Sequence, residues 1–241
     1  MRAYAICAAA ISALLGLCGC GETEPDLTER VALEEFYFFP DAGADFVVDS
    51  TVFDPAIDGT DRLRSTTSWR VTPLDTPGAS ASAKTYEVTL RDSAGLPRAA
   101  QYWQFEQTSA GLTHTYDGLT YLTVAALADL GREWDPLAFG DADLVLPFAG
   151  EPVALHKSWS ARLDSIGSYA LSDGTAVDAL YVTLADSENL LELRETREVY
   201  GRGLGLLLRE QRIFDTQQTG SSAPWEDKAE RGFALTMRRR L

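Results

Sequence analysis

The heptapeptide from Thr85 to Arg91, Thr-Tyr-Glu-Val-Thr-Leu-Arg, alternates apolar and polar side chains, and this alternation decides the fold class. Successive side chains of a β-strand point to opposite faces of the sheet, so Tyr86, Val88 and Leu90 would be buried while their neighbours face water. One wet face is typical of antiparallel sheets, because parallel strands are buried on both faces. We therefore expect an antiparallel sheet.

The same spacing of two recurs from Glu34 to the end of the chain, with turn residues between the periodic segments. It predicts about eleven strands, which is typical of a sandwich, a barrel or a strongly curved sheet. The clearest further strands are centred on Phe46 and Val48, Trp69 and Val71, Trp159 to Leu163, Val177 to Leu184, and Phe233 to Met237.

Turn chemistry separates these segments. Gly follows Asp directly or closely in four breaks, where a positive φ would close a hairpin and make consecutive strands neighbours. These breaks are Asp58-Gly59, Asp92 to Gly95, Asp117-Gly118 and Asp173-Gly174. Residues 73–83 and 216–230 are interpreted as longer surface loops.

One segment has a helical pattern. Val124, Leu127 and Leu130 recur at a spacing of three between Thr123 and Gly131, and Gly131 could end a helix. The prediction for residues 34–241 is therefore a single all-β domain: an antiparallel, strongly curved sheet or open barrel with one short helix.

The amino terminus has a different character. Arg2 precedes an apolar run of about fifteen residues, which fits a secretory signal and is shorter than the roughly 20 residues of a spanning helix. The run leads into Leu17-Cys18-Gly19-Cys20, which resembles the bacterial lipobox because a Leu lies three residues before a Cys and a small residue directly before it. Cys18 fits less well, since it follows Leu17.

The resemblance implies a lipid anchor. Cys20 would receive a diacylglycerol, residues 1–19 would be cleaved, and the new amino group would be acylated, for example with palmitate. Several acyl chains hold a protein firmly, because each buried methylene contributes about 0.8 kcal/mol. The acidic residues 20–33 are interpreted as a tether. We expect the protein to be located in the cell envelope. The outer membrane is favoured, and the sequence does not decide which of its faces the protein occupies.

The body resembles an uncharacterised family of β-rich envelope lipoproteins of the Bacteroidota. The family carries a Phe-Pro segment after the tether, an Asp-Ser strand, and a Glu-x-Tyr-x-x-Gly-x-Gly motif near its end. The chain departs from the family after Pro40. The matching segments here are Tyr37 to Pro40, Val47 to Thr51, Leu144 to Phe148 with Trp159, and Glu198 to Leu206. The resemblance implies a β fold and an envelope location, and it brings no activity with it.

Charge and cysteine content exclude several classes. The chain has 21 Lys plus Arg against 36 Asp plus Glu, a net charge of −15, which disfavours nucleic-acid binding. Cys7, Cys18 and Cys20 all lie in the first twenty residues, so the body has neither a disulfide nor a cysteine metal site. Few Lys and many Asp suggest a surface suited to strong salt, and a plain solubility margin is the alternative.

Apparent active-site features are weak. Gly201, Gly203 and Gly205 fit a bulge or bend better than a phosphate loop, because a strand follows instead of a helix. His114 and His156 are interpreted as surface or turn residues, without a zinc site or a Gly-x-Ser-x-Gly elbow.

The remaining candidates are carboxylates and aromatics. Pairs of acids are expected by chance among 36, and the aromatics fit either a sheet core or a sugar or lipid cleft. The residues concerned are Glu34-Glu35, Asp141 with Asp143 and Glu195 with Glu198 as carboxylate pairs, Asp54, Asp58 and Asp61 as a calcium loop, and Tyr102, Trp103, Phe105, Tyr116 and Tyr121 as the aromatics.

The sequence thus predicts a lipid-anchored envelope lipoprotein with a binding or structural role, no catalytic residues and no cofactor or metal. One alternative is a carrier cupping a lipid or acyl chain, which needs an enclosed apolar cavity of several hundred Å³. Another is a surface glycan-binding or hydrolysing protein. The partners we expect are the membrane, through Cys20, and a lipid, a glycan or an envelope protein.

Overall fold

The computed structural model describes residues 34–53, 62–75, 82–92, 94–116, 118–126, 129–140, 145–148 and 151–240. Residues Ala32–Leu241 form one compact unit. The signal segment, Cys20 and the tether lie outside the described residues. Asp54, Asp58, Asp61, Asp141 and Asp143 also lie outside them.

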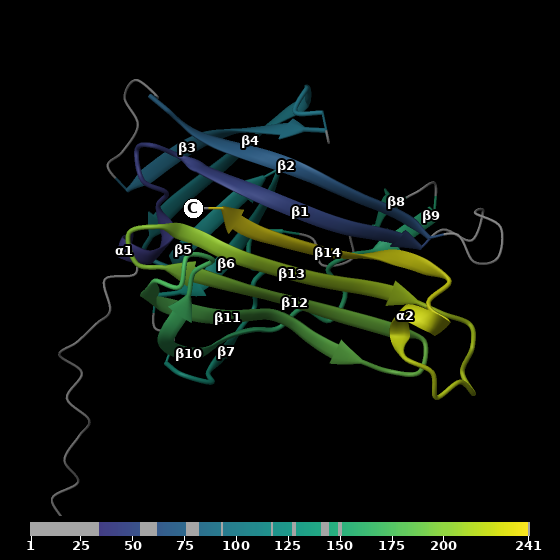
Figure 1. The fold of residues 1–241 in the computed structure, drawn as a ribbon. Coiled ribbons are helices and arrows are strands. Elements are labelled where there is room, and N and C mark those ends of the chain that lie inside the picture. The colour runs from purple at the N-terminus through teal and green to yellow at the C-terminus, as the bar shows by residue number, and fades with distance from the viewer. Residues whose placement is uncertain are drawn as a thin grey trace, which may run out of the picture. The chain divides into compact units, whose positions relative to one another are not determined.

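Twelve strands form one antiparallel sheet, in the order β6-β5-β4-β3-β2-β1-β14-β13-β12-β11-β10-β7 (Figure 1). A separate hairpin pairs β8 with β9. The strands are β1 Ala44–Phe53, β2 Leu63–Leu74, β3 Ala83–Arg91, β4 Pro97–Thr108, β5 Gly111–Tyr116, β6 Leu119–Ala125, β7 Glu133–Trp134, β8 Val145–Phe148, β9 Glu151–Ala154, β10 Ala161–Ala170, β11 Ala176–Glu188, β12 Glu192–Gly201, β13 Gly205–Asp215 and β14 Arg231–Arg240. The predicted all-β antiparallel class is confirmed.

The alternation predicted for β3 is observed at Tyr86 and Val88, whereas Leu90 is only partly buried. Tyr86 and Val88 are completely buried, whereas Thr85 and Glu87 are partly exposed. Hairpins join the strands as expected, and Gly95, Gly118 and Gly174 have positive φ. Trp159 lies in the connection before β10 rather than within a strand.

The predicted helix over residues 123–131 is wrong. Thr123 to Ala125 belong to β6, which pairs with β5. Thr123 and Val124 are β-branched and continue the extended Tyr121-Leu122 segment, so the cross-strand pairing overrides a spacing of three that is only three apolar residues long. The described helices are two single turns elsewhere, α1 Glu34–Tyr37 and α2 Trp225–Lys228.

The sheet curls until its two ends meet. The amide of Leu122 in β6 donates to the carbonyl of Pro136, which follows β7, at 2.8 Å. The Trp134 indole of β7 donates to the Leu122 carbonyl at 2.9 Å. The curled sheet therefore has an interior face, on which side chains from many of the strands are buried.

α1 and the Phe-Pro segment after it fill one end of this interior. Phe36, Tyr37 and Phe39 are at most 1% exposed. The Phe39 ring packs edge-on against Tyr86 and Phe105, with centroids 5.2 and 5.9 Å away. The Phe-Pro segment thus packs into this end of the interior.

The β8–β9 hairpin fills the interior toward the other end. Val153 is 1% exposed and packs with Ile213 and Phe233 from the sheet. On the outer face, Trp225 of α2 covers Phe53 and Phe214, and Figure 1 shows α2 over the ends of β12 and β13. The predicted loop 216–230 therefore contains a helical turn.

Candidate functional site

An ion pair is enclosed in the middle of the interior. Arg209 Nε of β13 donates to Glu198 Oε1 of β12 at 2.6 Å, and their side chains are 12% and 1% exposed. The Tyr200 hydroxyl donates to the other carboxylate oxygen of Glu198. Burial would lower the pKa of Arg209, but the neighbouring Glu198 carboxylate raises it above its ordinary value. The guanidinium is therefore charged at every accessible pH.

His114 of β5 faces this pair across the interior. Its Nδ1 lies 3.5 Å from Arg209 Nη2, and its ring stacks on Phe105 with centroids 4.2 Å apart. Burial, with the Arg209 charge adding to it, holds the pKa of His114 well below its usual range. The ring is neutral at physiological pH.

His156 is held by Tyr121, which is the cross-strand partner of His114. The Tyr121 hydroxyl and His156 Nε2 are 2.8 Å apart, and the Trp159 ring packs edge-on against the imidazole. Burial lowers the pKa of His156 to about 4. Both histidines are 2% exposed, so the expectation of surface histidines is wrong, although His156 does lie in a turn.

A small cavity lies beside His114 and the Glu198–Arg209 pair and has room for about 10 Å³, roughly one water molecule. Its wall combines aromatic rings with a polar floor and comes from five strands and the connection before β10. The lining residues are His114, Tyr116, Tyr121, Thr123, Trp159, Leu184, Thr196, Glu198, Arg209 and Gln211. His114 Nε2 and Thr196 Oγ1 are buried there without a hydrogen-bond partner.

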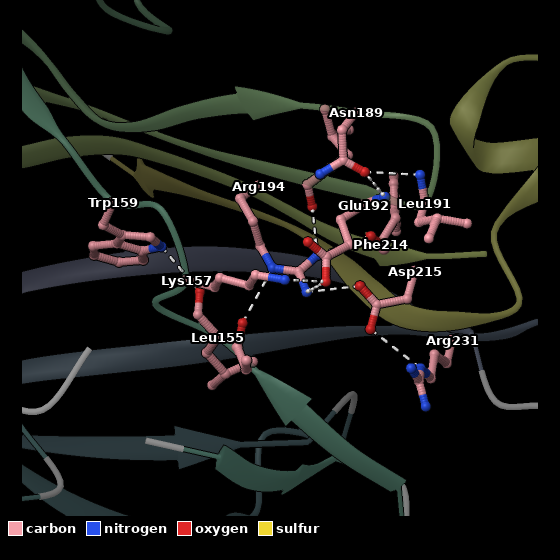
Figure 2. A network of polar contacts seen from close by, with 12 residues as sticks. Leu155, Lys157, Trp159, Asn189, Leu191, Glu192, Arg194, Phe214, Asp215 and Arg231 are labelled. Atoms are coloured by element: carbon pink, nitrogen blue, oxygen red, sulfur yellow. Dashed lines mark hydrogen bonds and ion pairs between the residues drawn. The ribbon is translucent and has the colours of Figure 1, made fainter. Parts of the chain in front are cut away.

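A second polar network closes the interior beside the β8–β9 hairpin (Figure 2). Arg194 of β12 is 2% exposed and donates to the backbone carbonyls of Ala154, Leu193 and Phe214. Its Nη2 also lies 2.7 Å from Asp215 Oδ1, and the other Asp215 oxygen accepts from Arg231. Glu192 Oε1 lies 4.0 Å from Arg194 Nη2 and is the fifth acceptor around the guanidinium. We therefore interpret Arg194 as a structural residue that holds the β8–β9 hairpin against the sheet.

The carboxylate pair Glu195 and Glu198 is not brought together. Glu195 pairs with Arg197 and Arg212, whereas Glu198 pairs with the buried Arg209. Residues three apart on a strand point to opposite faces. Glu35 pairs with Arg202.

The glycine run is a hairpin, not a phosphate loop. Gly201 pairs with Gly205, the Leu204 amide donates to the Gly201 carbonyl, and a bulge separates Val199 from Tyr200. Strand follows strand here, as the sequence predicted. No group of three metal-ligating side chains occurs among the described residues.

The candidate aromatic cleft divides between the two faces. Trp103, Phe105 and Tyr121 are buried in the interior, and half-buried Tyr116 lines the small cavity. Tyr102 is 59% exposed and follows the opposite face of β4. The core interpretation of these aromatics therefore holds for most of them.

The enclosed Arg194, Glu198 and Arg209 were not foreseen. The sequence contains one signal for Arg209. Arg209 and Gln211 lie on the same face of β13 as the buried Ile213, because side chains two apart on a strand share a face. Charged residues at such positions resemble a solvated strand face until the partner strand is known.

Comparisons with known proteins give fold neighbours at low similarity. No protein-family model and no curated protein matches the sequence. The chain is similar to a candidate exported protein with a YmcC-like fold from Bacteroides fragilis NCTC 9343, with 14% identity and a TM-score of 0.33 over 86% of this chain and 100% of that one. It is also similar to a candidate lipoprotein from Parabacteroides distasonis ATCC 8503, with 13% identity and a TM-score of 0.31 over 85% of this chain and 97% of that one. In the described part of the chain, no helix has the length and hydropathy needed to cross a membrane.

Proposed function

We propose that the chain is a lipid-anchored protein of the cell envelope, in which the β domain binds an envelope component or serves as a structural module. The observation that carries this proposal is the order of charged start, apolar run and Leu17-to-Cys20 motif. The acyl chains on Cys20 alone hold the protein, since a mature net charge near −16 (20 basic against 36 acidic residues once Arg2 is removed) gives no attraction to anionic lipid. The outer membrane is the favoured destination.

We further propose that the domain is not an enzyme. A glycosidase needs two carboxylates, one on each side of the scissile bond. Glu198 is the one carboxylate in the lining of the interior cavity, and Arg209 and Tyr200 already hold both of its oxygens.

The interior geometry favours a filled module over a lipid carrier. The interior space of about 10 Å³ has a polar floor and could not accept an acyl chain. Three larger hollows, of about 330, 430 and 320 Å³, are lined mainly by hydroxyl, amide and charged side chains.

The anchor is tested by replacing single cysteines in the full chain expressed in a bacterium fed with labelled palmitate. Cys20→Ser should abolish labelling and leave the precursor uncleaved. Cys18→Ser is the matched control and should be labelled and cleaved as the wild type is. Labelling of Cys20→Ser, or its loss in Cys18→Ser, would contradict the assignment of Cys20.

A further inference from the structure

Two buried polar groups face the small interior cavity without a partner. His114 and Thr196 are both 2% exposed, and His114 Nε2 and Thr196 Oγ1 make no hydrogen bond. Both residues line the same cavity. An unsatisfied buried polar group is costly, so two such groups in the wall of one cavity point to a molecule held between them.

The neighbouring contacts decide which hydrogen bonds the cavity offers. Arg209 Nη2 can only donate, so His114 Nδ1 must accept from it. In a neutral imidazole the other nitrogen then carries the hydrogen, and His114 Nε2 is a donor. The Thr196 hydroxyl can donate or accept, so the cavity suits an oxygen that accepts one hydrogen bond and takes part in a second.

The charges of the site favour a neutral ligand. Arg209 and Glu198 neutralise each other at 2.6 Å, so a charged ligand would bring an uncompensated charge into the interior. The walls also favour a ring-shaped ligand, because the half-buried rings of Tyr116 and Trp159 line the cavity. Aromatic faces pack well against the C–H faces of a ring-shaped ligand.

The volume limits how much of a ligand can enter. Room for about 10 Å³ admits one oxygen and no ring. The remainder of a ligand would lie against Tyr116 and Trp159, with the Gln211 amide beside it.

We propose that this cavity is the end of a binding site for a neutral saccharide or polyol, of which one hydroxyl enters between His114 Nε2 and Thr196 Oγ1. The proposal deepens the binding role given above and rests on it. It names His114 and Thr196 as the residues that recognise the hydroxyl and assigns no hydrolysis to the site.

Nuclear magnetic resonance of histidine side chains tests the proposal directly. The chain has two histidines, so the full-length protein labelled with ¹⁵N-histidine gives two imidazole spin systems, and His156 is an internal reference. The protein is held in micelles of a detergent without a sugar headgroup and titrated with glycerol, glucose, galactose, mannose and N-acetylglucosamine. Acetate is the charged comparison.

The expected result is a saturable shift of the His114 Nε2–H signal with at least one neutral compound, and no shift with acetate. Thr196→Val should weaken that binding by about tenfold, because it keeps the shape and removes the hydroxyl. Thr113→Val is the matched control, since Thr113 is also buried and bonds the Glu106 carbonyl outside the cavity. It should bind as the wild type does.

Three results overturn the proposal: no saturable shift with any of the neutral compounds, an equal response to acetate, or equal loss of binding in both threonine variants. The first would mean that the two groups serve an internal water alone. None of these results affects the palmitate experiment, so a failed ligand assignment and a failed anchor are distinguishable.

Discussion

Arg194 shows how a single buried charge can fix the position of a hairpin. Its guanidinium joins β9, β12 and β13 through the carbonyls of Ala154, Leu193 and Phe214 (Figure 2). The Asp215 carboxylate compensates the charge at 2.7 Å. Losing this guanidinium is expensive, because three carbonyls lose a donor and the buried Asp215 carboxylate keeps only Arg231 as a partner.

Replacing Arg194 with Met should therefore destabilise the fold strongly. Arg194→Met keeps much of the side-chain volume but removes the donor to three carbonyls and leaves Asp215 paired with Arg231 alone, and we expect a loss of about 3–5 kcal/mol in the free energy of unfolding. Urea denaturation followed by tryptophan fluorescence measures it. Arg162→Met is the control: its pairs with Asp164 and Asp186 are partly exposed, so it should cost under about 1 kcal/mol. Equal losses in the two variants would show that Arg194 does not fix the hairpin in this way.

The two buried histidines predict a loss of stability in mild acid. Their pKa values are lower in the folded chain than the usual value near 6.5, reaching about 4 for His156. The unfolded chain therefore binds more protons as the pH falls below about 6.5, and stability present above that pH is lost between about 6.5 and 4. Each histidine contributes a slope of up to about 1.4 kcal/mol per pH unit.

Urea denaturation at pH 7.0 and 5.5 measures this slope. His156→Gln can still reach the Tyr121 hydroxyl but cannot titrate, so its free energy of unfolding should fall less between the two values than that of the wild type. The same fall in both proteins would mean that other groups cause the acid sensitivity.

Some elements could be foreseen from sequence and others could not. β3 was predictable because Tyr86 and Val88 alternate with polar neighbours within one segment, so no distant partner is needed to interpret it. β6 was misjudged because three apolar residues do not define a period, and pairing with β5 decides its state. The Glu198–Arg209 pair is harder still to predict from sequence. It depends on which strands are neighbours and on how the sheet curls, and neither property is local.

At the scale of an element, the β12–β13 hairpin depends on close packing at one glycine. Gly205 has a φ of +74°, and a Cβ there would lie 2.8 Å from Cδ1 of the buried Phe39 ring. Phe39 cannot move easily, since other aromatic rings surround it.

Gly205→Ala should consequently destabilise the fold by about 2–4 kcal/mol, the sum of backbone strain and overpacking. Gly174→Ala is the matched control, because Gly174 has a φ of +85° with open space around its Cβ position. It carries only the backbone cost of a side chain at positive φ, about 1–2 kcal/mol. Thermal unfolding of both variants gives the difference, and equal midpoints would show that Phe39 adapts.

At the scale of the whole molecule, acidity should make stability depend on salt. The chain contains 36 acidic against 21 basic residues, a net charge of −15, and only three of the basic residues are lysines, Lys84, Lys157 and Lys228. Self-repulsion therefore opposes folding at low ionic strength. Molar NaCl reduces the Debye length to about 3 Å and screens this repulsion.

We expect the thermal midpoint of the protein to be several degrees higher in 2 M NaCl than in 20 mM NaCl. Sodium chloride is preferred to sulfate, because sulfate strengthens apolar burial in any protein. An unchanged midpoint would leave the acidity as a solubility margin only.

The closure of the sheet leaves one stretch of backbone with an aggregation hazard. β7 covers β10 only at Ala161 and Arg162, so in the described part of the chain residues 164–170 have a strand neighbour on one side only. A bare edge of this kind invites pairing between copies of the chain. The bulge after Leu163, the charge of Asp164 and the glycine at position 167 interrupt the edge. Removing them would turn β10 into a template for fibrous self-association.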